Sequence, residues 1–465
     1  MRWWLACGAI ALAALITPAT GHAHAELRSA EPAPGARLDA PESVRLVLSS
    51  PVEEAFLRLE VIGPRGERIS GPARRDPRDA RAILAPVRRA PPGRTVVVWR
   101  VLSQDGHPTG GAFALRVSPS PAAPAAVAGS PVRDDDGPLA VLARLLALAA
   151  PLGLLGLVTL SAGVVAPAVR LGGVAPPGRP PAERDAVRRR AEAALAAVAP
   201  RWWAAWWALA GAWALGLALV PVVLLRGLRE GPEGLWTLLS DTRAGAAWWV
   251  QLAGVLAAVA AALALRRAGP RPPAGPAWAV ALGLGPAAAM VAISWAGHAS
   301  SGGDRTANIV IDALHSAATA AWLGGLLGLA VLAIPAVRSL PGEERVRLGA
   351  GIVVRFSALA LVAVTLLVVT GVYRALAELP SVGEIADSGY GRALLVKLGL
   401  FAVLLIGGAY NRLVLHPRLE RAALGLDPGD RGASDALRIS VGAELAMAAV
   451  LMVSVAVLIS LPPPL

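Results

Sequence analysis

The chain has 465 residues, of which 55% are hydrophobic and 16% are charged, and its formal net charge is +12. An apolar share this large is typical of a chain that crosses a lipid bilayer several times. The sequence contains one cysteine, Cys7, which excludes an internal disulfide bond and a thiolate redox pair.

The first residues have the pattern of a secretory signal peptide. Arg2 supplies a positive charge, residues 3–16 form an apolar run too short to span a bilayer comfortably, and small residues surround Ala23. Cleavage after Ala23 makes residues 1–23 the signal peptide and His24 the first residue of the mature chain. The alternative cut, after Ala25, lies further from the apolar run and would remove His24.

Nitrogen and oxygen donors at two places in the exported part indicate a metal site. An N-terminal His24 offers both its amine and its imidazole to one ion. The segment Asp105-Gly106-His107 places a carboxylate and an imidazole on the same side of an extended chain. Residues 24–137 contain no Met, so this donor set suits copper(II) rather than copper(I). The alternative for the Asp-Gly-His segment alone is an ordinary polar turn.

Short segments rich in Val, Leu and Ile, separated by turns that contain Pro and Gly, are typical of an all-β domain. They cover residues 43–49, 56–62, 80–87, 95–102 and 112–117. This pattern predicts a small β-sandwich, Ig-like or cupredoxin-like, over residues 24–118. Residues 119–138 are rich in Pro and Ala and then acidic, and they are expected to be a linker.

Eight apolar stretches follow, each near the length that a bilayer requires. They cover residues 139–166, 202–225, 246–265, 277–296, 311–334, 352–373, 393–411 and 441–461. We therefore expect residues 139–461 to form an all-α polytopic membrane domain of eight transmembrane helices.

Arginines are concentrated in the loops after the first, third, fifth and seventh stretches. Because basic loops stay in the cytoplasm, the N-terminal domain is expected on the periplasmic or extracellular face of the inner (plasma) membrane. The net charge is then a topology signal rather than a nucleic-acid footprint. Tryptophans that are expected in interfacial belts are Trp202, Trp203, Trp206, Trp207, Trp248 and Trp249.

Ionisable side chains in the membrane part are candidates for function because they are costly there. His298 ends the fourth stretch and His315 lies near the start of the fifth, so the pair is predicted to receive a metal ion on the side of the exported domain. Asp312 precedes His315 by one helical turn and is expected to orient its ring. The alternative is one interfacial and one helix-packing histidine. Glu444 and Met447 on the last stretch are secondary candidates.

Two segments of the exported part resemble the CopC family of periplasmic copper-binding domains. They are His24-Ala-Glu-Leu-Arg-Ser-Ala-Glu-Pro-Ala-Pro-Gly and Trp99-Arg-Val-Leu-Ser-Gln-Asp105-Gly-His107-Pro-Thr-Gly-Gly-Ala-Phe113. The resemblance implies that copper(II) is held by His24, Asp105 and His107. The methionine-rich copper(I) site of some members is absent from this sequence.

The membrane part resembles the CopD copper-resistance membrane proteins. The matching segments are Trp295-Ala-Gly-His298, Asp312-Ala-Leu-His315, Trp322-Leu-Gly-Gly325, Arg355-Phe-Ser357, Thr370-Gly371, Tyr390-Gly-Arg-Ala-Leu-Leu-Val-Lys397, Asn411-Arg412 and Glu444. Together the two resemblances imply a copper-homeostasis and copper-resistance protein that captures copper(II) outside the inner membrane and moves copper across it, inward.

Copper is therefore the expected bound metal and cargo, with the lipid bilayer and periplasmic copper chaperones as candidate partners and no nucleic acid. The sequence has neither a Gly-rich phosphate loop nor a nucleophile with a partnered base, so we expect neither an ATP-driven pump nor an enzyme. The main alternative makes His298 and His315 axial haem ligands in a membrane electron carrier or copper(II) reductase. A copper oxygenase is a third hypothesis, but no substrate surface is evident.

Overall fold

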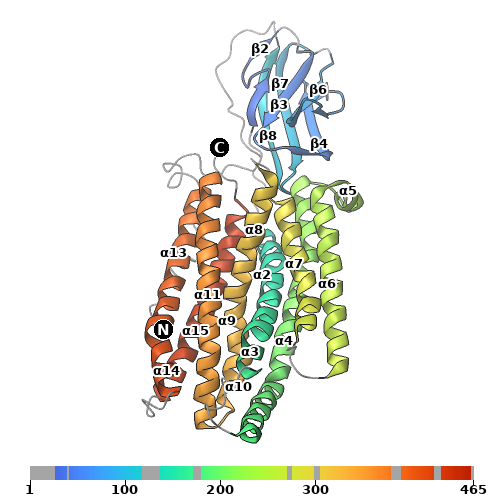
Figure 1. Ribbon diagram of the computed structural model, residues 1–465. Coiled ribbons are helices and arrows are strands. Elements are labelled where there is room, and N and C mark those ends of the chain that lie inside the picture. The colour runs from blue at the N-terminus through green and yellow to red at the C-terminus, as the bar shows by residue number, and fades with distance from the viewer. Residues whose placement is uncertain are drawn as a thin grey trace.

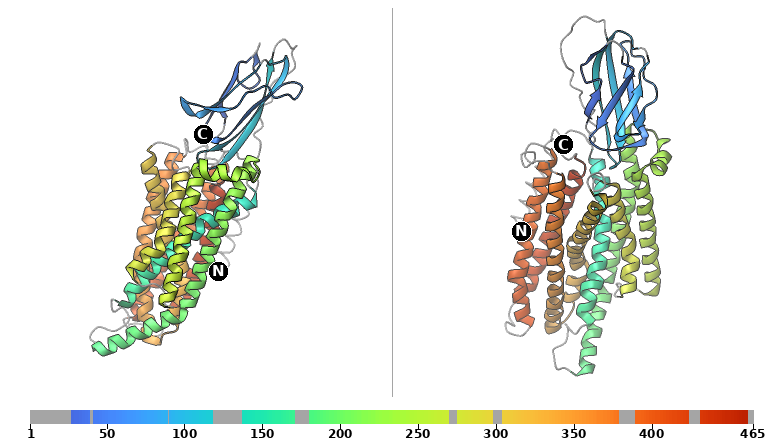
Figure 2. Two further views of the ribbon diagram at one scale, coloured as in Figure 1. Left: turned by 90° about the vertical axis from the view of Figure 1, so that its right-hand side faces the viewer. Right: turned by 45° about the horizontal axis from the view of Figure 1, so that its top comes forward.

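The computed structural model describes residues 27–38, 41–88, 90–117, 137–170, 180–269, 275–297, 304–378, 389–423 and 431–461. Strands occupy the described part up to residue 117, and helices occupy the rest. The strands form a compact unit that stands on one end of a bundle of long helices (Figure 1). The other views show the same stacking (Figure 2), so the β domain is seated on the end of the bundle and not along its side.

The β domain is a two-layer sandwich. Its strands among the described residues are β1 Leu27–Glu31, β2 Arg37–Leu38, β3 Ser43–Leu48, β4 Val52–Ile62, β5 Arg74–Asp76, β6 Asp79–Pro86, β7 Gly93–Ser103 and β8 Pro108–Val117. One sheet has the order β1-β3-β6-β5 and the other β2-β8-β7-β4. Neighbouring strands are antiparallel except for β2 and β8. The predicted all-β domain is confirmed, with a strand at each predicted segment. The apolar pattern misses β1, β2 and β5, which are short and rich in polar residues.

Alternation along the strands builds the core between the two sheets. Leu46 and Leu48 of β3 are fully buried, as are Leu59 and Val61 of β4, and Trp99 of β7 packs into the same cluster. Each side chain of this size contributes roughly 1.5–3 kcal/mol when it is removed from water. The packed sheets therefore hold β7 and β8 firmly, together with the turn that joins them.

The helical part begins at Pro138. Its described elements are α2 Pro138–Leu160, η1 Ser161–Val165, α3 Ala166–Arg170, α4 Pro181–Leu228, α5 Gly234–Asp241, α6 Arg243–Ala268, α7 Pro276–Ala296, α8 Arg305–Thr319, η3 Ala320–Gly324, α9 Gly325–Gly328, η4 Leu329–Ala333, α10 Ile334–Arg338, α11 Gly342–Glu378, α13 Gly389–Tyr410, η5 Asn411–Leu415, α14 His416–Ala423 and α15 Arg431–Leu458. Those labelled η are single π-helical turns within longer segments. Eight continuous segments of the described chain are long and apolar enough to cross a membrane, which confirms the predicted membrane helices.

The tryptophans of α4 face the interior of the bundle. Trp202 and Trp206 are fully buried and stack with their ring centroids 5.3 Å apart, and Trp203 is 3% exposed. The Trp202 indole N–H donates to the Ser161 hydroxyl of η1 at 3.0 Å. The expected interfacial belt is therefore wrong for these three residues. The reason is that α4 packs this face against α2 and η1, where the indole N–H of Trp202 finds a polar partner.

Candidate metal site at the domain junction

The predicted metal-binding segment forms the turn between β7 and β8 (residues 104–107, the β7–β8 turn). The Ser103 hydroxyl lies within hydrogen-bond distance of the Asp105 carboxylate and 3.0 Å from the carbonyl oxygen of His107. Gly106 has a φ of +85°, a conformation that side chains disfavour. The segment is therefore a tight turn and not the extended chain that its spacing suggested. It presents Asp105 and His107 at one end of the sandwich.

The described chain after His24 starts at the same end of the sandwich. His24 itself lies outside the described residues. Leu27, the first residue of β1, pairs with Leu48 at the end of β3. Just beyond β3, the carbonyl oxygen of Pro51 accepts a hydrogen bond of 2.9 Å from the backbone N–H of Gln104. β1 therefore begins at the end of the domain that carries the β7–β8 turn.

The β7–β8 turn is pressed against the membrane helices. A Cβ atom placed on Gly106 would lie 3.9 Å from the Cβ atom of Ala244 at the start of α6, which is ordinary van der Waals contact. Pro108, the first residue of β8, packs on Gly227 near the end of α4 so closely that a side chain at Gly227 would collide with it. The candidate metal ligands thus lie at the junction of the two domains.

A guanidinium from the helical domain reaches the ring of His107. His107 is 7% exposed, and its Nδ1 lies 3.4 Å from Nη2 of Arg144 on α2. Nη1 of the same Arg144 donates to the hydroxyl of Ser460, just beyond the end of α15. Because a guanidinium can only donate, Nδ1 of a neutral ring accepts in this contact and the ring proton is on Nε2.

Further contacts hold the sandwich on the bundle. Arg58 forms an ion pair of 2.7 Å with Glu230, and Arg100 donates to the carbonyl oxygen of Gly227 at 2.5 Å. An apolar cluster joins β4 and β7 to α4 and α5, formed by Phe56, Leu102, Leu224, Leu225, Leu228 and Leu238. Polar and apolar contacts together fix the orientation of the β7–β8 turn above the helices.

Arg243, at the start of α6, contacts the sandwich through its backbone and its side chain. Its backbone N–H donates to Oε1 of Glu53 at 3.0 Å, and its Nη1 donates to Oε1 of Gln104 at 3.3 Å. Burial raises the pKa of Glu53 to about 7, while the charge of Arg75 acts in the opposite direction. Glu53 therefore changes charge near neutral pH within the domain junction.

The donors of the β7–β8 turn fit copper(II) by type. Asp105 supplies oxygen and His107 supplies nitrogen, and neither is a soft sulfur ligand. Within the described stretches, no group of three or more His, Cys, Asp or Glu side chains is placed to hold a metal ion. The turn therefore provides part of a donor set, and the remaining ligands have to come from elsewhere.

His315 lies on α8 and faces α11. Its Nδ1 is 2.9 Å from Oγ1 of Thr370, and the Thr370 hydroxyl donates to the carbonyl oxygen of Leu366 at 2.5 Å. A hydroxyl has one proton, so Oγ1 accepts a hydrogen bond from Nδ1–H of His315. The neutral ring then carries its lone pair on Nε2, one of the two imidazole nitrogens through which histidine binds metals.

Asp312 does not take the predicted role of orienting His315. Its carboxylate forms an ion pair with Arg374 of α11 and accepts a hydrogen bond of 2.5 Å from the Ser294 hydroxyl. A charge-assisted bond to a guanidinium is stronger than one to a neutral ring, which explains the choice of partner. Thr370 orients the ring in its place.

Trp295, near the end of α7, links the two regions. Arg243 and Arg305 lie over its ring at 5.1 and 5.8 Å from the centroid. Arg243 also contacts the β7–β8 turn, so a short series of side chains joins that turn to the start of α8. His298 follows Trp295 closely in sequence but lies outside the described residues, and only His315 of the predicted pair is described.

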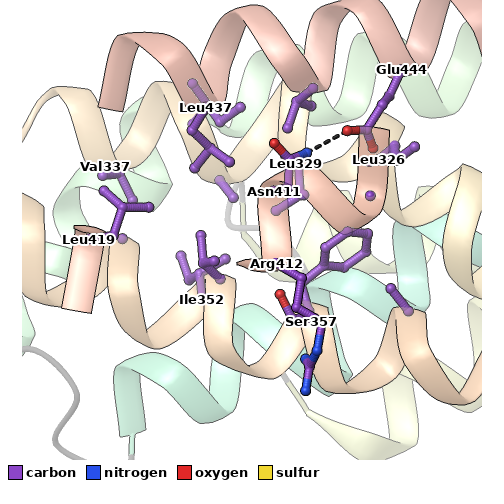
Figure 3. A pocket seen from close by; sticks show the side chains of 18 of the residues that line it. Leu326, Leu329, Val337, Ile352, Ser357, Asn411, Arg412, Leu419, Leu437 and Glu444 are labelled. Carbon is purple, nitrogen blue, oxygen red and sulfur yellow. Dashed lines mark hydrogen bonds between the residues drawn. The ribbon is translucent and has the colours of Figure 1, made fainter. Parts of the chain in front are cut away.

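A second polar site lies in the half of the bundle remote from the sandwich. Glu444 of α15 is 2% exposed and accepts a hydrogen bond from the Asn411 amide of η5 (Figure 3). Both line a mainly apolar cavity of about 300 Å³ between α10, α11, η5 and α15. Met447 is buried but is not part of the wall. The predicted carboxylate and thioether are thus not presented together to this cavity.

Sequence reasoning missed the arginines of the junction. Arg243 and Arg374 lie at the ends of spans, where basic residues usually report only topology. Arg144 lies within the first apolar stretch, and a charged residue inside a membrane span is a signal of function. That signal could have identified Arg144, although its contact with His107 is a long-range one.

Two family models match the chain. The CopC domain model matches residues 27–118, which include all the described strands, and the model of copper resistance protein D (CopD) matches residues 350–458, from α11 to the end of α15. Both matches agree with the resemblances seen in the motifs. They give no support to the haem alternative.

Three relatives align with different parts of the chain. Copper transport protein CutJ of Bacillus subtilis is 26% identical over 491 residues, which cover 100% of this chain and 78% of CutJ. Protein YobA of Escherichia coli is 36% identical over 112 residues, which cover 23% of this chain and 90% of YobA. Copper resistance protein D of Pseudomonas syringae pv. tomato is 28% identical over 260 residues, which cover 53% of this chain and 80% of that protein.

Solved structures match the β domain. CopC from Methylosinus trichosporium OB3b is 25% identical, with 22% of this chain and all of that chain covered and a TM-score of 0.20. PcoC, a copper resistance protein from Escherichia coli, is 24% identical, with 20% and 99% covered and a TM-score of 0.19.

Proposed function

We propose, because this chain belongs to the CopC and CopD copper-resistance families, that it captures copper(II) outside the inner membrane and moves copper across it, inward. The sandwich is the capturing part and the helical domain is the pathway. Copper is the cargo, and the protein is a carrier or channel rather than an enzyme.

The observation that carries this proposal is the contact between the β7–β8 turn and the membrane helices. Asp105 and His107 match ligand positions of the CopC family, and Nδ1 of His107 lies 3.4 Å from Arg144 of α2. An ion that leaves this turn is therefore beside the helices that would receive it.

We propose His24 as the third ligand of the capture site. β1 begins with Leu27 at the end of the sandwich that carries the turn. Three residues of extended chain span about 10 Å, enough for a mature N-terminus to approach Asp105 and His107. After signal cleavage, the amine and the ring of His24 would complete a nitrogen-rich set that suits copper(II).

We propose that His298 and His315 receive the ion from the sandwich. The hydrogen bond to Thr370 supports this, because it keeps the metal-binding lone pair of His315 on Nε2. The contacts of Arg243 with the turn and with Trp295 connect the turn to the end of α7, the helix that precedes His298.

The inward direction is what the resemblance to the copper-resistance families implies, and the orientation of the membrane domain concerns only the side on which copper is captured. The excess of arginine in alternate loops supports a sandwich on the periplasmic or extracellular face and a bundle that leads inward. Periplasmic copper chaperones are suitable donors for a site at this face. In this arrangement residues 1–23 are removed as a signal peptide and residues 24–118 capture copper. Residues 119–138 link the two domains, and residues 139–461 conduct copper across the membrane.

The test is a measurement of cell-associated copper in copper-limited cells that express the protein. We expect wild type to raise cellular copper, and both Asp105→Ala/His107→Ala and His298→Ala/His315→Ala to abolish the gain. His416→Ala is the matched control, because His416 pairs with Glu420 on α14 and lies outside both sites. Less copper in cells with wild type would contradict inward transport, and a gain that survives in both double variants would contradict the proposed sites.

A further inference from the structure

We propose that Arg144 competes with copper for His107, so that docking of the sandwich on the bundle promotes release of the ion. This inference rests on the proposed function, because it concerns the step between capture by the sandwich and transfer to the helices. It assigns a role to a residue of the membrane domain that belongs to neither ligand set.

Two polar contacts fix the position of the Arg144 guanidinium. Nη2 lies 3.4 Å from Nδ1 of His107, and Nη1 donates to the Ser460 hydroxyl. That hydroxyl in turn donates to the carbonyl oxygen of Ala456 at 2.8 Å, so its oxygen is oriented to accept from Arg144. The guanidinium is therefore held by the membrane domain in the place where the docked sandwich presents His107.

The contact with Arg144 and ligation of copper by His107 exclude each other. A guanidinium has no acceptor atom, so Nδ1 of His107 uses its lone pair in this contact and the proton of the neutral ring lies on Nε2. Copper needs an imidazole nitrogen with an available lone pair. In the docked arrangement both ring nitrogens are committed, and His107 cannot bind the ion without leaving Arg144.

The two guanidinium groups at the junction act in the same direction. Arg243 contacts Gln104, the residue before Asp105, so a second guanidinium lies next to the turn. A divalent cation in this buried junction is repelled by both, and such repulsion is stronger away from bulk water. Docking therefore lowers the affinity of the turn for copper at the point where the ion has to leave it.

The geometry also gives the release a direction. Arg144 lies on α2 and Ser460 follows α15, so the competing group belongs to the bundle and meets His107 only when the two domains are in contact. Copper is displaced beside the helices and not in open solvent. Once the ion has left, the hydrogen bond between Arg144 and His107 stabilises the docked domain.

The test compares the copper(II) affinity of the purified full-length protein in detergent, measured by competition with a chelator of known affinity. Arg144→Met keeps a long apolar side chain and loses the hydrogen-bond donor. We expect this variant to bind copper(II) about tenfold more tightly, because the ion no longer competes with one charge-assisted hydrogen bond. Arg144→Lys keeps a donor and the charge, and it should remain close to wild type.

Arg58→Met is the matched control. It also removes an arginine from the junction, but Arg58 pairs with Glu230 and not with the turn. We expect its affinity for copper(II) to equal that of wild type. If Arg144→Met does not fold, Ser460→Ala provides a second variant. It removes the hydrogen bond that holds Nη1 of Arg144, so the guanidinium is less firmly placed beside His107. We expect its affinity for copper(II) to rise as well, by a smaller factor.

Two outcomes would overturn the inference. They are an Arg144→Met or Ser460→Ala protein that binds copper(II) no more tightly than wild type, and an Arg58→Met protein that gains as much affinity as Arg144→Met. Cellular copper is measured in parallel to separate this test from that of the proposed function. If wild type fails to raise cellular copper, transport is wrong whatever the affinities, whereas uptake by wild type with unchanged affinities contradicts competition by Arg144 alone.

Discussion

At the scale of single residues, two histidines are held in opposite tautomers by their neighbours. Arg144 donates to Nδ1 of His107 and leaves the ring proton on Nε2. Thr370 accepts from Nδ1 of His315 and leaves the lone pair on Nε2. In the docked arrangement the Nδ1 lone pair of His107 is therefore occupied, while the lone pair of His315 is on Nε2. This contrast agrees with transfer from His107 toward His315.

The Thr370 hydroxyl can be tested by substitution. Thr370→Val keeps the shape of the side chain but removes the acceptor for Nδ1–H of His315, so the ring loses its fixed tautomer and orientation. We expect copper uptake to fall by about tenfold, as for loss of the partner of a metal-binding histidine. Thr370→Ser restores the acceptor and should retain most of the uptake. Uptake by Thr370→Val at the wild-type rate would show that this hydrogen bond has no part in transport.

At the scale of helices and strands, much of the architecture could be predicted because it depends on local patterns. The Val-rich segments of β7 and β8 and the long apolar stretches carry their own periodicity and length. The interfacial position predicted for Trp202 and Trp206 is wrong, because a single sequence does not distinguish interfacial tryptophans from buried ones. Only the packing of α4 on α2 distinguishes them. The structure places the predicted Asp-Gly-His segment between β7 and β8, but its turn conformation depends on Ser103 and on the left-handed Gly106.

The domain junction could not be predicted because its partners are far apart in the chain. Arg58 meets Glu230, and His107 meets Arg144, through contacts that no periodicity records. The sequence also predicts that Asp312 orients His315, because the two residues are one helical turn apart and the distant partner of Asp312 leaves no local pattern. In the structure Asp312 forms an ion pair with Arg374, because a guanidinium from another helix binds the carboxylate more strongly than a neutral ring does.

At the scale of the whole molecule, the docked arrangement should depend on pH through Glu53. In the docked state its pKa is about 7, and in a separated, hydrated domain the usual value is 4.5. Between these two values the docked form holds a proton that the separated form has lost, so docking weakens as pH rises and the loss is complete above about pH 7. Arg75 favours the ionised form and reduces the effect without reversing it.

We therefore expect the docking equilibrium constant to fall by more than tenfold between pH 5 and pH 8. Glu53→Gln keeps an acceptor for the backbone N–H of Arg243 and removes the titration, so its docking should not change over this range. Spin labels at Arg65→Cys on the sandwich and Trp236→Cys on α5 would report the distance between the domains. Equal pH dependence in wild type and Glu53→Gln would exclude Glu53 as the cause.

The central claim is that this one chain captures copper at its sandwich and conducts it through its bundle. The most direct measurement is copper entering vesicles that contain only the purified full-length protein and enclose a copper-binding dye. Wild type should fill the vesicles, and Asp105→Ala/His107→Ala and His315→Ala should each reduce the initial rate by at least tenfold. Vesicles with wild type that take up copper no faster than protein-free vesicles would contradict the account.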